Sequence, residues 1–109
     1  MVIYGLHTCS VCKNAFKVLE AAGKDVEFRD IRADPLSEVE LAEFIEEFGD
    51  RLVDRKSNDY RALNDWLKNS EAEAQISAKP KVMTRPVIRD QERLYLGWDD
   101  VVQNILSPG

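Results

Sequence analysis

The first thirty residues constrain the fold most, because they predict a strand, a turn, a helix and a second strand. Val2-Ile3-Tyr4 is a short apolar run that Gly5 ends, and residues 6–10 form a turn. Over residues 26–30, Val26, Phe28 and Asp30 alternate with Glu27 and Arg29, as the two faces of a strand do. The intervening helix has apolar residues at helical spacing before Gly23: Val11, Ala15, Val18, Leu19 and Ala22. This order predicts a parallel strand pair with a right-handed crossover.

The rest of the chain predicts helices followed by a strand hairpin. Ser37 and Glu40 have the spacing of a capping box, and the helix after them has Leu41, Phe44, Ile45 and Phe48 on its core face. A second helix is expected over residues 60–67, and residues 70–79 predict a further helical turn or two. Val87-Ile88 and residues 94–96 predict a hairpin. A last helix over 99–106 has this apolar side: Val101, Val102, Ile105 and Leu106.

Length and charge limit the class of protein. A chain of 109 residues predicts one domain, 1–109, which is adequate as a monomer. The net charge of −5 argues against binding to nucleic acid or to an anionic membrane, since both need a basic face. The start lacks the basic region of a signal peptide, and no stretch reaches the ~18 apolar residues of a membrane span. We therefore expect a cytoplasmic protein.

The two cysteines form the motif Cys9-Ser10-Val11-Cys12 at the predicted strand-to-helix turn. Thiols stay reduced in the cytosol, so a structural disulfide is not expected. The unpaired N–H groups of a helix N-terminus favour a thiolate, which lowers the pKa of Cys9. Cys12 follows one turn later, where it can attack a mixed disulfide on Cys9. The motif therefore predicts a redox site with Cys9 as nucleophile and Cys12 as resolving thiol.

Other interpretations of these residues remain open. A closed zinc site needs four ligands, whereas the chain offers two thiols and one histidine, so we expect no metal. Free cysteines also pack as small apolar residues, and this alternative is stronger for Cys12 than for Cys9. His7 either tunes Cys9 or is a solvated loop residue. Two interpretations are also open for Lys13: it tunes Cys9, or it is a solvated lysine on the helix.

Three stretches make the chain resemble the ArsC/Spx family. The first is Ile3-Tyr4-Gly5 followed by the two cysteines, Lys13 and Ala15; the second runs from Leu52 to Ser57 and on to Tyr60-Arg61-Ala62-Leu63. The third is Thr84-Arg85-Pro86-Val87-Ile88, followed by Arg93-Leu94 and Gly97. This resemblance implies a thioredoxin-like three-layer α/β sandwich, with a mixed four-stranded sheet. It also implies a helical insertion between the second and third strands, at about residues 37–80.

The resemblance also assigns residue roles. It implies that the bond before Pro86 is cis, although most X-Pro bonds are trans. The arginines that hold an oxyanion in the family's arsenate reductases match Arg55, Arg85 and Arg93 here. Guanidinium groups suit tetrahedral oxyanions because they bind them bidentately. The alternative for Arg55 and Arg93 is that each is an ordinary surface residue.

Two functions follow from the resemblance. One is a thiol–disulfide oxidoreductase like the arsenate reductases, in which Cys9 attacks an oxyanion or a mixed disulfide. Glutathione is then a co-substrate rather than a bound cofactor, and glutaredoxin is a partner. The other is an Spx-type transcriptional regulator that binds the RNA polymerase α subunit through a Cys9–Cys12 switch.

Single-cysteine arsenate reductases usually have Ser where Cys12 stands, which argues against arsenate but not against redox chemistry. A glutathione-dependent reductase of another substrate is a third possibility.

Overall fold

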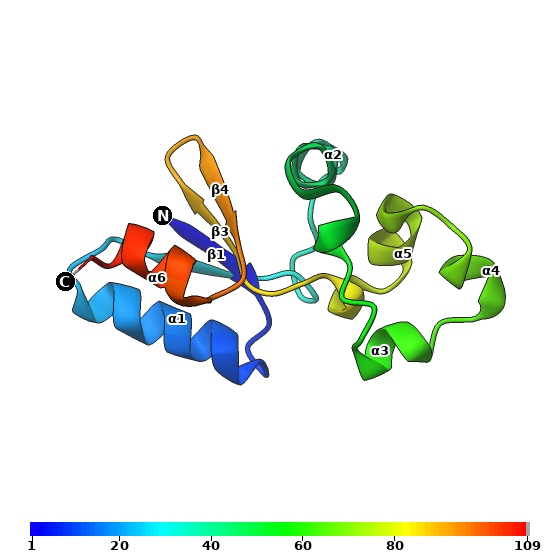
Figure 1. Ribbon diagram of the computed structural model, residues 1–109, viewed down its shortest axis with the longest axis horizontal. Coiled ribbons are helices and arrows are strands. Elements are labelled where there is room, and N and C mark those ends of the chain that lie inside the picture. The colour runs from blue at the N-terminus through cyan, green and yellow to red at the C-terminus, as the bar shows by residue number, and fades with distance from the viewer. Residues whose placement is uncertain (109) are drawn as a thin grey trace. The chain divides into compact units, whose positions relative to one another are not determined.

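The computed structural model describes residues 1–108 and divides the chain into two compact units (Figure 1). The first, called the sheet unit below, consists of residues 1–34 and the chain from Arg85 onward. The second, the helical unit, is Pro35–Thr84 and contains the helical segment expected at about 37–80. The cysteine motif and the hairpin therefore belong to the sheet unit.

Four short strands form one mixed sheet in the sheet unit. They are β1 (Val2–Gly5), β2 (Glu27–Asp30), β3 (Val87–Asp90) and β4 (Arg93–Leu96), in the order β2-β1-β3-β4. β1 is parallel to β2, as the crossover predicts, and antiparallel to β3, which pairs with β4 as a hairpin. The predicted α/β fold with a mixed four-stranded sheet is confirmed.

Helices α1 (Ser10–Ala21) and α6 (Asp100–Leu106) pack on one face of this sheet (Figure 1). Strand residues Ile3 and Ile88 point to that face because they pair directly in the register. The buried residues of this core are Ile3, Ala15, Leu19, Ile88, Val102 and Leu106. Their burial removes apolar surface from water, which is the main favourable term in folding.

The apolar faces of both helices are narrower than the sequence predicts. In α1 the core face is Cys12, Ala15 and Leu19, whereas Val11 and Val18 are exposed. In α6, Val102 and Leu106 are buried, but Val101 is 66% exposed and Ile105 52%. Each short helix contacts the sheet along one row of residues, so adjacent apolar positions are left facing solvent.

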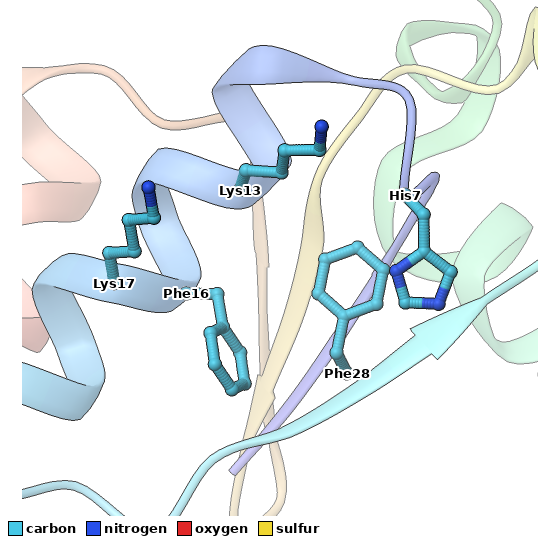
Figure 2. Close-up of a pocket in the computed structure, with 5 residues that line it drawn as sticks. All are labelled: His7, Lys13, Phe16, Lys17 and Phe28. Atoms are coloured by element: carbon cyan, nitrogen blue, oxygen red, sulfur yellow. The ribbon is translucent and has the colours of Figure 1, made fainter.

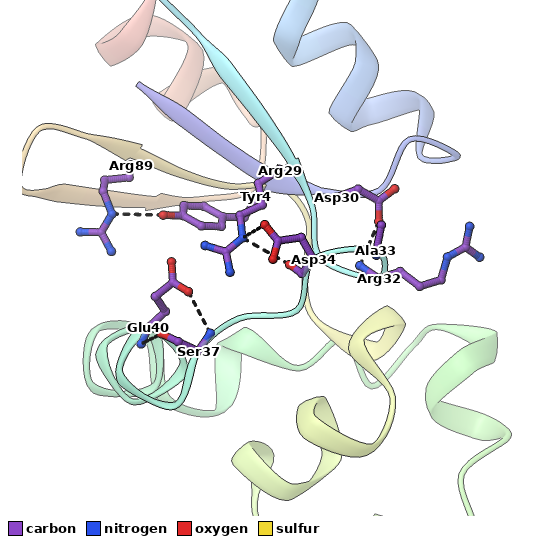
Figure 3. A network of polar contacts seen from close by, with 9 residues as sticks. All are labelled: Tyr4, Arg29, Asp30, Arg32, Ala33, Asp34, Ser37, Glu40 and Arg89. Atoms are coloured by element: carbon purple, nitrogen blue, oxygen red, sulfur yellow. Dashed lines mark hydrogen bonds and ion pairs between the residues drawn. The ribbon is translucent and has the colours of Figure 1, made fainter.

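The helical unit contains α2 (Glu38–Phe48), α3 (Asn58–Arg61), α4 (Asp65–Lys68) and α5 (Ala72–Ala78), with short 3-10 turns Gly49–Leu52 and Pro80–Val82. The capping box at the start of α2 is confirmed: the Glu40 backbone N–H donates to the Ser37 hydroxyl at 3.1 Å, and the Ser37 N–H donates to the Glu40 carboxylate at 2.8 Å (Figure 3). In the described residues, no helix is long and apolar enough to cross a membrane.

The expectation of one helix over residues 60–67 is wrong. The chain forms α3 and α4 instead, and the break lies at Asn64, whose side chain accepts a hydrogen bond from the Leu67 backbone N–H at 2.8 Å. Asn is a strong N-cap residue, so it starts a new helix rather than continuing the old one. Trp66, in α4, is exposed.

The end of β2 is fixed by a buried carboxylate. Asp30 is 9% exposed and accepts three backbone hydrogen bonds, one of them from the N–H group of His7 at 3.0 Å. The other two come from the N–H groups of Arg32 at 2.9 Å and Ala33 at 3.2 Å, in the loop that Figure 3 shows. These hydrogen bonds, the His7 N–H first, hold the pKa of Asp30 below its ordinary value, although burial opposes this. Asp30 therefore ties the turn after β1 to the loop after β2.

We expect Asp30→Ala to lower the free energy of unfolding by about 2 kcal/mol at pH 7, because it leaves part-buried N–H groups without an acceptor. Thermal or urea denaturation measures the change, with the exposed Asp34→Ala as control. The folded-state pKa is depressed, so this stabilisation is present above pH ~4 and is lost as the pH falls further. A difference between wild type and variant that grows on acidification would contradict this assignment.

Candidate functional site

Cys9 lies at the junction between β1 and α1, where it is the N-cap residue of the helix. Its backbone N–H donates to the Leu6 carbonyl at 3.0 Å, and its carbonyl accepts from the Lys13 N–H at 3.1 Å. The first turn of α1 contains no acidic residue. The positive end of the helix is thus not neutralised by its own side chains, which favours an anion at Cys9.

Cys12 is fully buried beneath the end of β1, and both cysteines are free thiols. A Cβ atom at Gly5 would lie 2.5 Å from the Cys12 Sγ and 3.1 Å from its Cβ. Only glycine allows the strand to approach the helix this closely. Gly5 is therefore a site residue, whereas the sequence analysis treated it as the end of a strand and as part of a family motif, with no role at the cysteines.

The chain before β3 reaches the same end of the sheet. Tyr4, near the end of β1, pairs with Val87, the first residue of β3, so Arg85 and Pro86 lie where the Cys9 turn begins. The Arg85–Pro86 peptide bond is cis, as the family resemblance implies. Arg85 is close enough to Cys9 for a hydrogen bond between their side chains.

The environment of Cys9 favours its thiolate. Partial burial alone would raise the pKa of Cys9, but other interactions outweigh it and lower the pKa below the ordinary value. The Cys12 backbone N–H and the Cys12 thiol both donate hydrogen bonds to the sulfur, and Arg85 contributes a hydrogen bond and its positive charge. The sequence-based argument from the helix N-terminus predicted this direction.

Cys12 has the opposite character. Burial is the largest cause that raises the pKa of Cys12 to about 12. Its hydrogen bond to Cys9 and the negative charge of the Cys9 sulfur act in the same direction, whereas the Leu6 backbone hydrogen bond and the Arg85 charge oppose them. The thiol of Cys12 therefore keeps its proton at neutral pH and donates it to Cys9. One sulfur is prepared as the nucleophile and the other as the hydrogen-bond donor.

The structure does not bring Arg93 to Cys9. Val87 marks the Cys9 end of β3, whereas Arg93 pairs with Asp90, three residues further along the strand. That separation is about 10 Å. The family resemblance implied an anion-binding role for Arg93. The register places this residue beside the turn of the hairpin instead, where its side chain is exposed.

Arg55 belongs to the helical unit, before α3. Its side chain is 60% exposed and lies 3.9 Å from the Asp50 carboxylate, which is a long, solvated ion pair. Of the three arginines expected to hold an oxyanion, Arg85 is the one that the sheet unit places at Cys9. The anion-binding role of Arg55 stays a prediction.

His7 and Lys13 flank the cysteine turn on one side. The His7 ring is exposed but stacks on Phe28, with ring centroids 4.7 Å apart. Lys13 projects from the first turns of α1 (Figure 2). The sequence did not single out Asp30, which positions His7 through the backbone. The available signal was an acidic residue on the same face of an alternating strand as Val26 and Phe28. Among residues 1–108, no three His, Cys, Asp or Glu side chains cluster as a metal site requires.

With this geometry established, comparison with known proteins identifies the family. Residues 4–103 match the sequence profile of the ArsC family. The chain belongs to the ArsC family. Among curated ArsC-family relatives it is similar to the global transcriptional regulator Spx 2 of Lactococcus lactis, with 28% identity over 92% of this chain and 80% of that protein. The global transcriptional regulator Spx of Listeria monocytogenes is 27% identical over 92% and 81%.

Solved structures confirm the thioredoxin-like ArsC fold. A protein described as YFFB (PA3664) superposes with a TM-score of 0.86, at 24% identity and with 96% of each chain covered. An arsenate reductase (ArsC) related protein from Brucella melitensis gives a TM-score of 0.72 at 26% identity, over 95% of this chain and 91% of the other. The resemblance inferred from the three sequence stretches is thus confirmed.

We expect Arg85→Gln to raise the pKa of Cys9, because it removes the guanidinium charge beside the sulfur. The pH dependence of iodoacetamide alkylation, followed by mass spectrometry, gives this pKa. In the wild type the midpoint lies below the ~8.5 of free cysteine, and in the variant it moves upward. Lys24→Gln, which removes a positive charge beyond the far end of α1, is the matched control. Equal shifts in both variants would contradict a specific role for Arg85.

Proposed function

We propose that the protein is a thiol–disulfide oxidoreductase that uses both cysteines. The observation that carries this proposal is the placement of half-buried Cys9 at the start of α1, beside Arg85, with buried Cys12 one helical turn later. Membership of the ArsC family supports it. The geometry offers one partly exposed sulfur whose thiolate is favoured by its surroundings and a second thiol in hydrogen-bond contact with it.

The reaction begins at Cys9. Its thiolate attacks one sulfur of a disulfide R–S–S–R′, a bond forms between Cys9 and the R–S sulfur, and R′–S⁻ leaves and takes a proton from water. The negative charge on Cys9 disappears in this step. Since that charge helps to raise the pKa of Cys12, Cys12 becomes easier to deprotonate once the mixed disulfide has formed.

Cys12 then completes the exchange. Its sulfur attacks the Cys9 sulfur, the bond between Cys9 and the R–S sulfur breaks, and the Cys12 proton passes to the departing sulfur, so that R–SH leaves as the Cys9–Cys12 disulfide forms. The substrate disulfide has been reduced by two electrons, and the protein dithiol has been oxidised by two. Two molecules of a thiol such as glutathione, directly or through glutaredoxin, reduce the protein again.

A disulfide is a better-supported substrate than arsenate. Exchange requires Cys9, Cys12 and Arg85, which the sheet unit brings together. The family's arsenate site requires two more arginines, and the register places Arg93 at the other end of β3. Turnover with arsenate, glutathione and glutaredoxin tests the alternative directly, with Cys9→Ser as the inactive control.

We expect Cys12→Ser to accumulate a mixed disulfide on Cys9, because the resolving sulfur is missing. After one equivalent of oxidised glutathione, intact-mass measurement detects the adduct in this variant and the internal Cys9–Cys12 bridge, without adduct, in the wild type. Cys9→Ser gains neither at a comparable rate. The proposal fails if Cys9→Ser reacts as fast as the wild type.

A second candidate function is an Spx-type regulator. Its support is the naming of the curated relatives, which are global transcriptional regulators with 26–28% identity, together with the two-cysteine motif. In this case the Cys9–Cys12 disulfide is a switch, and the partner is the α subunit of RNA polymerase.

This candidate predicts binding that depends on redox state. A pull-down with the C-terminal domain of the polymerase α subunit compares the reduced protein with the oxidised one. We expect a change in captured protein between the two states for the wild type, and no change for Cys12→Ser, which cannot form the bridge. Absence of binding in both states would remove the regulator from consideration.

A further inference from the structure

A groove lies between α1 and β2, beside the cysteine turn (Figure 2). Its volume is about 220 Å³, and its lining residues are His7, Lys13, Phe16, Lys17 and Phe28. All of them belong to the sheet unit. The redox chemistry described above uses none of their side chains.

Two lysines of the groove lie on the same row of α1 as the nucleophile. Cys9, Lys13 and Lys17 are spaced four residues apart, so they form one row along α1. With a rise of about 1.5 Å per residue, the two lysines follow Cys9 at about 6 and 12 Å along the helix. Long side chains on a helix lean towards its N-terminus, and Lys13 extends towards the turn that carries His7 (Figure 2).

The floor of the groove is aromatic. Phe28 stacks with the His7 ring at an interplanar angle of 20°, and Phe16 meets Phe28 edge-on at 6.0 Å. Both phenylalanines also pack against the core of the sheet unit, which fixes them in place. A preformed apolar surface of this kind suits a flat or aliphatic group of a ligand.

The rim of the groove is positively charged. Lys13 and Lys17 are exposed, no carboxylate lines the groove, and neither ammonium group is in an ion pair within the described chain. The protein as a whole carries a net charge of −5, so this is a local reversal of sign. Charge complementarity therefore favours an anionic ligand group.

The volume limits what the groove holds. Sites for whole small molecules usually measure about 300–1,000 Å³. A groove of about 220 Å³ is smaller, so it suits one substituent of a molecule rather than all of it. Because its two lysines follow Cys9 along one row of α1, we expect the rest of that molecule to extend towards the reacting sulfur.

We propose that this groove binds the apolar, carboxylate-bearing group of a low-molecular-weight disulfide while the sulfur of that group reacts with Cys9. Phe16 and Phe28 contact the apolar part, and Lys13 and Lys17 pair with the carboxylate. The inference rests on the proposed function and adds a substrate class to it: acidic, apolar disulfides. The bonds made and broken are those of the exchange described above.

The test compares an anionic and a neutral aromatic disulfide on the full chain. The probes are 5,5′-dithiobis(2-nitrobenzoate), which has a carboxylate on each ring, and uncharged 4,4′-dithiodipyridine. Stopped-flow absorbance gives the second-order rate constant for each at pH 7 and low salt. We compare variants by the rate constant for the anionic probe divided by the rate constant for the neutral probe. Any change in the thiolate fraction of Cys9 cancels in this ratio.

We expect the double variant Lys13→Gln/Lys17→Gln to lower this ratio about fivefold, as two partly solvated charge pairs predict, and high salt to reduce the difference. The matched control Lys24→Gln/Lys68→Gln removes two lysines outside the groove and leaves the ratio unchanged. Phe16→Leu keeps the apolar packing and lowers the rate with the aromatic anion relative to aliphatic 3,3′-dithiodipropionate.

The outcomes separate the two proposals. If Cys9 reacts with neither probe faster than free cysteine at the same thiolate fraction, the oxidoreductase proposal fails. If it reacts with both probes and the groove variant has the same ratio as its control, the groove assignment fails and the oxidoreductase proposal stands. The small-molecule assignment is also overturned if the lysines affect only disulfides carried by acidic peptides.

Discussion

The close approach of β1 to α1 at Gly5 is the constraint on which the candidate site depends. With no side chain at this position, the Cys12 sulfur fits directly beneath the strand, where a Cβ would be 2.5 Å away. Cys12 is then buried on the core row of α1 with Ala15 and Leu19. The same packing sets the start of the helix, and so it sets the position of Cys9.

In that arrangement a single hydrogen bond changes the pKa values of the two cysteines in opposite directions. The Cys12 thiol donates to Cys9, which lowers the pKa of Cys9 and raises the pKa of Cys12. Burial increases the difference between the two pKa values, because desolvation penalises the charged form of the buried Cys12 thiol. At Cys9, Arg85 opposes desolvation with both a hydrogen bond and its positive charge. Asp30 supports the turn from the other side by fixing the His7 backbone N–H.

The sequence predicted the elements that depend on local signals. The strand–helix–strand order, the capping box at Ser37 and the hairpin all follow from spacing and turn chemistry, and the structure has them. Side-chain burial was predicted less well: Val11 and Val101 have the helical spacing of core residues but are exposed, because the sheet covers only a narrow stripe of each helix. The break at Asn64 was missed because apolar spacing alone continued through a capping residue.

In the site, too, the sequence predicted the residues placed by local structure better than those placed by strand pairing. Cys9 and Cys12 are three residues apart in the chain, so their geometry follows from the first turn of α1, which Cys9 caps and which contains Cys12. Arg85 reaches them through strand pairing, which the order of the family's motifs indicated, whereas Arg93 depends on the register of β4, where every residue of offset moves it about 3.3 Å. The cis bond at Pro86 and the pairing of β3 with β1 therefore place Arg85 at the nucleophile, whereas the pairing of β4 with β3 places Arg93 beside the hairpin turn, and of these two arginines only Arg85 contributes to the chemistry at Cys9.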